Sequence, residues 1–144
     1  MKVALDENIP LGIVRAFQAL TNEGTISDVE FVSARDYSED HEKDDVPWVK
    51  RFAADGGQVI ISGDKRMRAR LHERDALASA GMIVFYFTSA WSNANEFTKS
   101  AMLLSWWPKI AEYMESSKAG DCWEIPFQWH WKELRDVRAD KDGS

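Results

Sequence analysis

The feature that most constrains the fold of this chain is an alternation of short apolar runs with segments of helical spacing. The runs are residues 2–6, 29–33, 58–62 and 82–88. Between the first two runs, Ile9, Ile13 and Phe17 recur at the three- or four-residue intervals of one helix face. Strands and helices that alternate in this way are typical of a parallel sheet with helices on both faces.

Capping and turn residues predict where the first helices begin and end. Asn8 is a candidate cap for the first helix, with Pro10 in its first turn and a stop at residues 22–24. Residues 36–45 hold six acidic side chains in ten, which favours an extended, solvated loop. A second helix is expected from Val46 until the glycines at 56 and 57, and a third over residues 65–80.

The last third of the chain predicts one more helix and one more strand. Residues 95–107 have helical spacing, with Phe97, Ala101 and Leu104 on one face. Pro108 is expected to break, kink or restart this helix, which can run on to Tyr113 and Met114. Residues 123–127 are a strand candidate, and the proline within them predicts a place at the sheet edge.

These elements together predict an α/β fold with three layers, helix–sheet–helix, around a mainly parallel sheet of four to five strands. We expect a single domain over residues 1–137, because a chain of 144 residues can bury a core without staples. Residues 138–144 are polar and are expected to fray.

The composition argues against several classes of protein. The single cysteine, Cys122, cannot form an internal disulfide and is expected to be a small, semi-buried apolar residue. No apolar run is long enough to span a bilayer, and Asp6 interrupts the start of the chain too early for a secretory signal. We therefore expect a cytoplasmic protein without a membrane partner. Its net charge of −6 means that binding RNA would need a local basic patch or a metal ion.

Three acidic positions are expected to meet at one edge of the sheet. Asp6 ends the first run and Asp64 follows the third, and the carboxyl ends of parallel strands share an edge. A third acid, Asp45 or Asp44, starts the second helix, which begins at the same edge. Carboxylates brought together resist joint ionisation unless a cation lies between them. Oxygen ligands suit Mg²⁺ or Mn²⁺, which can activate water for attack on a phosphodiester.

Ordinary structural roles for the same acids stay open at this point. Asp44 and Asp45 stand where aspartate commonly caps a helix, and Asp64 follows a glycine as turn residues often do. Asp6 can contribute to the start of the first helix. Spacing alone does not decide between these roles and a metal site.

The acids lie in three motifs, LDEN at 5–8, DDVPW at 44–48 and VIISGD at 59–64. In this order the motifs resemble those of the PIN-like domain family, and more narrowly those of the VapC-type toxin ribonucleases of toxin–antitoxin pairs. The resemblance covers residues 1–90 well. It implies an endoribonuclease that uses Mg²⁺ or Mn²⁺, with catalytic residues Asp6, Asp45 and Asp64 and with Asp44 as the alternative metal ligand. It also implies an antitoxin partner.

The chain departs from the family pattern at two places. Relatives often carry a second acid where Arg66 stands, and no confident fourth acid follows the fourth strand, where Glu96 is one of the polar groups present. Glu7 and Glu96 are therefore secondary candidates. These departures motivate an alternative function, a catalytically weak or inactive PIN-like module that binds RNA or a protein.

A basic cluster directly after Asp64 is the sequence's candidate for RNA contact. Lys65, Arg66 and Arg68 are nearest the acids and can run along substrate phosphates, although the cluster can also be a solvated helix face. Tryptophans such as the pair at 106 and 107 can stack bases, but packing is their commoner role. Acids at strand ends also occur in receiver domains, which are a further alternative. A receiver domain needs a lysine after its last strand, and no such lysine is evident in this sequence. A homodimer is left open.

Overall fold

The computed structural model describes residues 1–40, 42, 45–63 and 71–137, and of residues 71–73 the backbone alone. Its sheet has six strands in the order β2-β1-β3-β4-β5-β6. The first five strands are parallel to one another, and β6 pairs antiparallel with β5. The strands are β1 (Lys2–Leu5), β2 (Glu30–Ser33), β3 (Val59–Ser62), β4 (Ile83–Phe87), β5 (Cys122–Ile125) and β6 (Arg135–Asp136).

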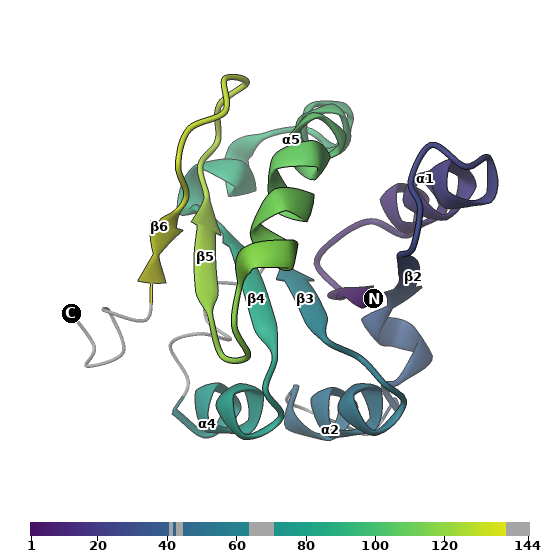
Figure 1. Ribbon diagram of the computed structural model, residues 1–144, viewed down its shortest axis with the longest axis vertical. Coiled ribbons are helices and arrows are strands. Elements are labelled where there is room, and N and C mark those ends of the chain that lie inside the picture. Colours follow the sequence, from purple (N-terminus) through teal and green to yellow (C-terminus); the bar gives the residue numbers. More distant parts are fainter. Residues whose placement is uncertain (41, 43–44, 64–70, 138–144) are drawn as a thin grey trace.

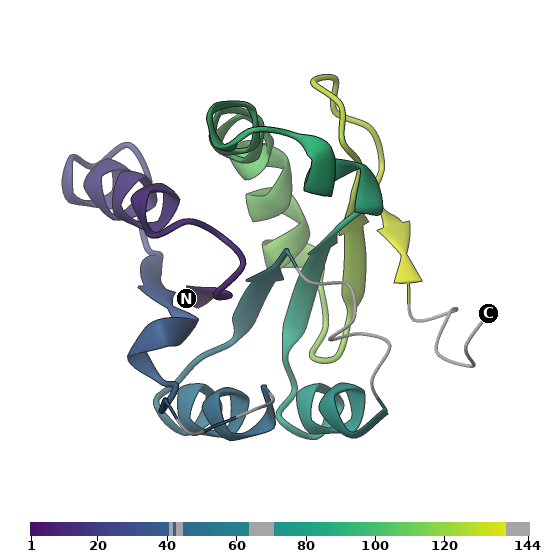
Figure 2. The ribbon, with the colours of Figure 1, turned by 180° about the vertical axis from the view of Figure 1, so that it is seen from behind.

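Helices cover both faces of this sheet, so the predicted three-layer architecture is confirmed. Helices α1 and α5 lie on one side and α2 and α4 on the other, in the front view (Figure 1) and from behind (Figure 2). The helices are α1 (Leu11–Asn22), α2 (Val46–Ala54), α4 (Leu71–Ser79) and α5 (Glu96–Ser116), with short 3₁₀ turns η1 (Ala34–Asp36) and η2 (Ser89–Asn93).

The sheet separates two apolar cores, because alternate strand residues point to opposite faces. In β1, Val3 and Leu5 pack with α1 and α5, whereas Ala4 packs with α2 and α4. All five residues of β4 are buried, which explains why its sequence is apolar without alternation. The larger core, beneath α1 and α5, also contains Trp106 and Trp107. Packing is therefore the role of this tryptophan pair.

The start of α1 differs from the prediction. Pro10 is the residue before the first helical turn, and α1 has no side-chain cap. Asn8 instead donates its backbone N–H to the Asp6 carboxylate, at 3.0 Å. The loop between β1 and α1 is thus shaped by Asp6, and the expected cap at Asn8 is wrong.

Helix α5 continues through Pro108, which is exposed, so the proline neither ends nor restarts the helix, and of its three predicted effects only a kink is compatible with this. The predicted continuation to Tyr113 and Met114 is confirmed, and Trp106, Trp107 and Ile110 on either side of the proline are buried in the core. Tertiary packing of this kind outweighs local propensity. The predicted packing face is wrong, since Phe97 is 89% exposed. The helix buries the neighbouring stripe instead.

The final strands correct the predicted sheet. β5 is not an edge strand, because Trp123 and Glu124 pair with β6. The proline that suggested an edge stands directly after β5, where it removes no ladder hydrogen bond. With two residues, β6 is too short to leave an apolar pattern, and its presence makes the sheet six-stranded instead of four- to five-stranded. Cys122 is half-buried, as expected.

The strand order places a ligand site. The chain turns from β1 outward to β2, then crosses back to β3 on the other side of β1. Ligands of open α/β sheets bind beyond the carboxyl ends of the strands at such a reversal. In this fold that point lies after Leu5 and Ser62. Within the described part of the chain, no helix is long and apolar enough to cross a membrane.

Candidate active site

Asp6 is the buried acid at the point where the strand order reverses. It follows β1 directly and is 3% exposed. Its backbone N–H donates to the Ile61 carbonyl of β3 at 3.0 Å, which fixes it against the neighbouring strand. Ser62 at the end of β3 donates its hydroxyl to Oδ2 at 2.5 Å, and Asn8 donates its backbone N–H to Oδ1 at 3.0 Å. Asp6 does not cap α1, so that alternative role is wrong.

The environment makes the charge of Asp6 costly. Burial raises the pKa of this carboxyl to about 6, and the Asp45 charge pushes it in the same direction. The hydrogen bonds from Ser62 and from the backbone of Gly63 and Asn8 lower the pKa but do not compensate. A carboxylate in this position is stabilised by a nearby positive charge.

Asp45 stands directly before α2 and is held there by a tryptophan. Its Oδ1 accepts a hydrogen bond from the indole N–H of Trp48 at 2.8 Å, and its side chain makes no capping bond. Trp48 is 2% exposed, so its ring is fixed in the core. Asp45 is partly buried and close enough to Asp6 for its charge to act on that carboxyl. The two predicted acids are thus near enough for the Asp45 charge to raise the pKa of Asp6.

The other predicted ligands, Asp64 and Asp44, lie outside the described residues. Gly63, the residue before Asp64, reaches the Asp6 carboxylate with its backbone N–H. Among the described residues, no group of three histidine, cysteine, aspartate or glutamate side chains is arranged to hold a metal ion. The three-acid site thus stays a prediction.

The loop between β1 and α1, which carries Asp6, is held by hydrogen bonds from Arg35, shortly after the end of β2. Arg35 of η1 donates to the Glu7 carbonyl at 2.8 Å and to the Ile9 carbonyl at 3.3 Å. Glu7, a secondary candidate, is exposed, and it is its backbone carbonyl that accepts from Arg35. The arginine therefore holds the backbone on either side of Asn8 at a fixed distance from β2.

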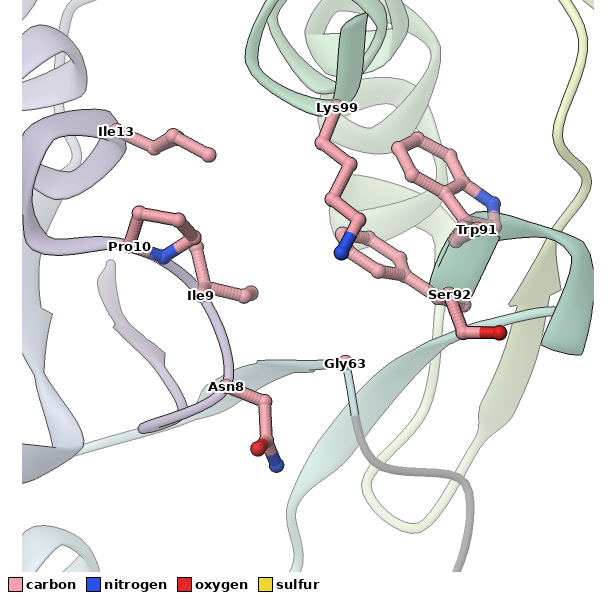
Figure 3. Close-up of a pocket in the computed structure, with 9 residues that line it drawn as sticks. Asn8, Ile9, Pro10, Ile13, Gly63, Trp91, Ser92 and Lys99 are labelled. Atoms are coloured by element: carbon pink, nitrogen blue, oxygen red, sulfur yellow. The ribbon is translucent and has the colours of Figure 1, made fainter. Parts of the chain in front are cut away.

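A cleft of about 250 Å³ opens beside Asp6 at the carboxyl edge of the sheet. Figure 3 shows its two walls, with Ile9, Pro10 and Ile13 on one side and Trp91 on the other. Asn8, whose backbone N–H donates to Asp6, and Gly63 line its floor. The cleft therefore adjoins the loop that holds Asp6, although Asp6 itself does not line it.

One cation, Lys99 of α5, reaches into this cleft from above the floor (Figure 3). The predicted RNA contacts Lys65, Arg66 and Arg68 lie outside the described residues. Glu96, the other secondary acid, is exposed in the first turn of α5 and does not line the cleft.

Comparison with known protein families agrees with this geometry. The family model described as a PIN like domain matches residues 1–89, more than half of the chain. The chain belongs to the PIN-like domain family. No curated protein and no solved structure matches it. PIN-like domains are commonly nucleases, so the match supports a nuclease and favours the PIN-like reading over the receiver-domain alternative.

Three residues around Asp6, Asp45 and the cleft were not predicted from the sequence. Ser62 belongs to the motif VIISGD, but only the sheet register shows that its hydroxyl meets Asp6. Trp48 follows Asp45 by three residues, a spacing that places two side chains on one helix face and that signals their contact. Lys99 gave no signal, because its position in the cleft depends on how α5 lies over the sheet.

Proposed function

We propose that this PIN-like domain is a metal-dependent endoribonuclease that hydrolyses RNA phosphodiesters with an activated water. The observation that carries the proposal is the buried Asp6 carboxyl at the reversal of strand order, with a raised pKa and a second acid, Asp45, acting on it. Burial of a carboxylate without a cationic partner costs free energy, and carboxylates with such perturbed pKa values cluster at functional sites.

The residues present fit a hard divalent cation. An ionised carboxylate offers roughly four acceptor positions. Ser62 and Asn8 each use one of those of Asp6, which leaves acceptor positions for a cation. The donors of this site are oxygens, which suit Mg²⁺ or Mn²⁺. We assign the cation to Asp6, Asp45 and Asp64, with Asp44 as the alternative to Asp45.

The chain's own residues orient and charge the site. The hydroxyl of Ser62 and the two backbone N–H groups fix the plane of the Asp6 carboxylate, and the indole of Trp48 fixes that of Asp45. Burial of Asp6 lowers the local dielectric, which strengthens its attraction for a cation. When bound, the cation supplies an acidified water and neutralises charge on the phosphate.

RNA cleavage tests this proposal. The purified chain should cut single-stranded RNA with Mg²⁺ or Mn²⁺ and stop in EDTA, and Asp64→Asn should abolish the activity while leaving the protein folded by circular dichroism. Activity that persists in EDTA would contradict the metal-dependent mechanism. Tight RNA binding with no product under either metal would favour the alternative, a non-cleaving PIN-like module.

We further propose that the domain is the toxin of a type II toxin–antitoxin pair, which its VapC-like motifs support. Induced expression should arrest growth, and Asp6→Asn should remove the arrest. Co-expression of a short neighbouring reading frame that encodes a DNA-binding protein should relieve it. Normal growth on expression of an active nuclease would refute the toxin role while leaving the ribonuclease standing.

A further inference from the structure

We propose that the cleft beside Asp6 is a nucleotide subsite, which holds the unit of single-stranded RNA next to the scissile phosphate while Lys99 contacts a neighbouring phosphate. This inference rests on the proposed ribonuclease function and adds a substrate-binding site to it. Lys99 and the walls of the cleft lie outside the three acidic motifs, and only the floor residues Asn8 and Gly63 belong to them.

The walls of the cleft suit a base. Pro10 and Ile13 face Trp91 across it in Figure 3. Trp91 is fixed by stacking on Phe87, with ring centroids 4.1 Å apart and planes 12° apart, and its indole donates to the Ile125 carbonyl at 2.9 Å. The slot is therefore preformed, and an entering apolar ring loses water without ordering these side chains.

The size and position of the cleft limit what it takes. Its volume of about 250 Å³ is below the roughly 300–1,000 Å³ of pockets for drug-sized ligands, which favours one unit of a longer ligand. Asn8 and Gly63 line it and also donate to Asp6. A polymer with one phosphate at Asp6 would therefore place its adjacent unit here.

The charge of Lys99 favours a phosphate partner. Lys99 forms no ion pair or side-chain hydrogen bond with the described residues, whereas Lys2, Arg51 and Lys109 each pair with a carboxylate. It is half-buried, and its ammonium points into the cleft (Figure 3). In a chain with a net charge of −6, an uncommitted cation beside an apolar slot attracts an anionic group locally.

Binding of a short, fluorescently labelled single-stranded RNA, measured by anisotropy in EDTA, tests this subsite without cleavage. Lys99→Gln should weaken binding about tenfold or more, as expected for a lost charge-assisted hydrogen bond. The slope of log affinity against log salt should fall by about 0.7 for one lost phosphate contact. Lys99→Arg should retain most of the affinity. Lys50→Gln, a change of an exposed lysine on α2 at the opposite face, is the matched control and should have no effect.

A second variant tests the base. Ser92→Trp adds a ring at the exposed rim of the cleft, outside the acidic site. Wild type should bind the RNA more tightly than an RNA with one abasic position, and Ser92→Trp should bind both equally. The subsite is refuted if Lys99→Gln has the affinity and salt slope of wild type, or if wild type does not distinguish the abasic RNA. Because no metal is present, neither result depends on cleavage, and failure of the nuclease is recognised separately with Mg²⁺.

Discussion

Two aspartates, one at the amino ends of the parallel strands and one at their carboxyl ends, have opposite electrostatic environments. At the amino edge, Asp55 accepts from Lys2 at 2.6 Å and from the Tyr37 hydroxyl at 2.5 Å. These hydrogen bonds, Lys2 first, lower the pKa of Asp55. At the carboxyl edge, Asp6 is buried without a cationic partner among the described residues, and its pKa is raised to about 6.

The difference distinguishes a carboxylate whose charge is matched within the chain from one whose charge is not matched by the described residues. Asp55 is exposed and its charge is matched within the chain, so it needs nothing further. Asp6 is held ionised at neutral pH only against its burial, and the nearby acid Asp45 adds to that cost. Side chains whose pKa is shifted by burial and by a nearby like charge cluster at functional sites. The comparison therefore predicts that Asp6 governs activity and Asp55 does not.

The largest expected effect is on catalysis. Asp6→Asn should reduce the rate of RNA cleavage by more than about 100-fold, since even the partners of metal ligands contribute 10–100-fold. Asp55→Asn removes the same charge from the other edge and should leave the rate within about twofold once both variants are shown to be folded. Equal losses in both variants, measured by initial rates in Mn²⁺, would mean that the two edges do not differ in function.

The pH dependence of stability should distinguish the same two residues. Because the pKa of Asp6 is raised in the fold, the native state binds its proton more tightly, and the free energy of unfolding falls as pH rises from about 4 to about 6. A shift from 3.8 to about 6 corresponds to about 3 kcal/mol. Asp6→Asn should remove this loss, so the variant should be more stable than wild type at pH 7.

Asp55 should behave with the opposite sign. Its lowered pKa contributes stability that is present above its ordinary value and disappears as pH falls through the folded pKa. Urea denaturation of wild type and both variants at pH 4 and pH 7 measures these differences. A stability gain for Asp6→Asn that is as large at pH 4 as at pH 7 would contradict the assignment of the cost to ionisation.

Metal binding should increase the stability of the protein through Asp6 and not through Asp55. At a concentration 100 times its dissociation constant, Mg²⁺ or Mn²⁺ should add about 2.7 kcal/mol to the stability of wild type. Thermal unfolding should show this increase in wild type and in Asp55→Asn, and it should disappear in Asp6→Asn. An unchanged increase in Asp6→Asn would place the ion elsewhere in the protein.

The smallest effect is expected from the residue that positions Asp45. Trp48→Phe keeps an aromatic ring but removes the N–H that Asp45 accepts, and should lower metal-dependent cleavage about tenfold. Excess metal should restore part of the rate. Trp106→Phe is the matched control, because Trp106 is also buried and donates to a backbone carbonyl, that of Gln128, away from the acids. It should lower stability without changing the metal dependence.

The fold was largely predictable because its strongest signals are local. The apolar runs of β3 and β4 and the glycines after α2 place these elements within a residue or two of their observed bounds. Features that depend on tertiary contacts were missed. The face that α5 packs is set by how the helix lies on the core, and β6 exists only as a partner of β5.

The site divides in the same way. The positions of Asp6 after a strand and Asp45 before a helix were predicted because strand ends and helix starts are visible in the sequence. The contacts of Ser62 and Trp48 with these acids and the position of Lys99 in the cleft were not, since each depends on parts of the chain that folding brings together. A pattern of residue types can thus locate the edge where chemistry occurs, whereas the groups that orient and charge it emerge from the packing.

The central claim is that Asp6, Asp45 and Asp64 hold one cation at the carboxyl edge, and the most direct measurement is the position of Mn²⁺ in a crystal. Anomalous scattering should place the ion within about 2.5 Å of a carboxylate oxygen of Asp6 and of Asp64. The account is contradicted if no ion lies at Asp6 in saturating Mn²⁺, or if the carboxyl groups of Asp6 and Asp64 are more than about 10 Å apart, beyond the reach of one or two bridging ions.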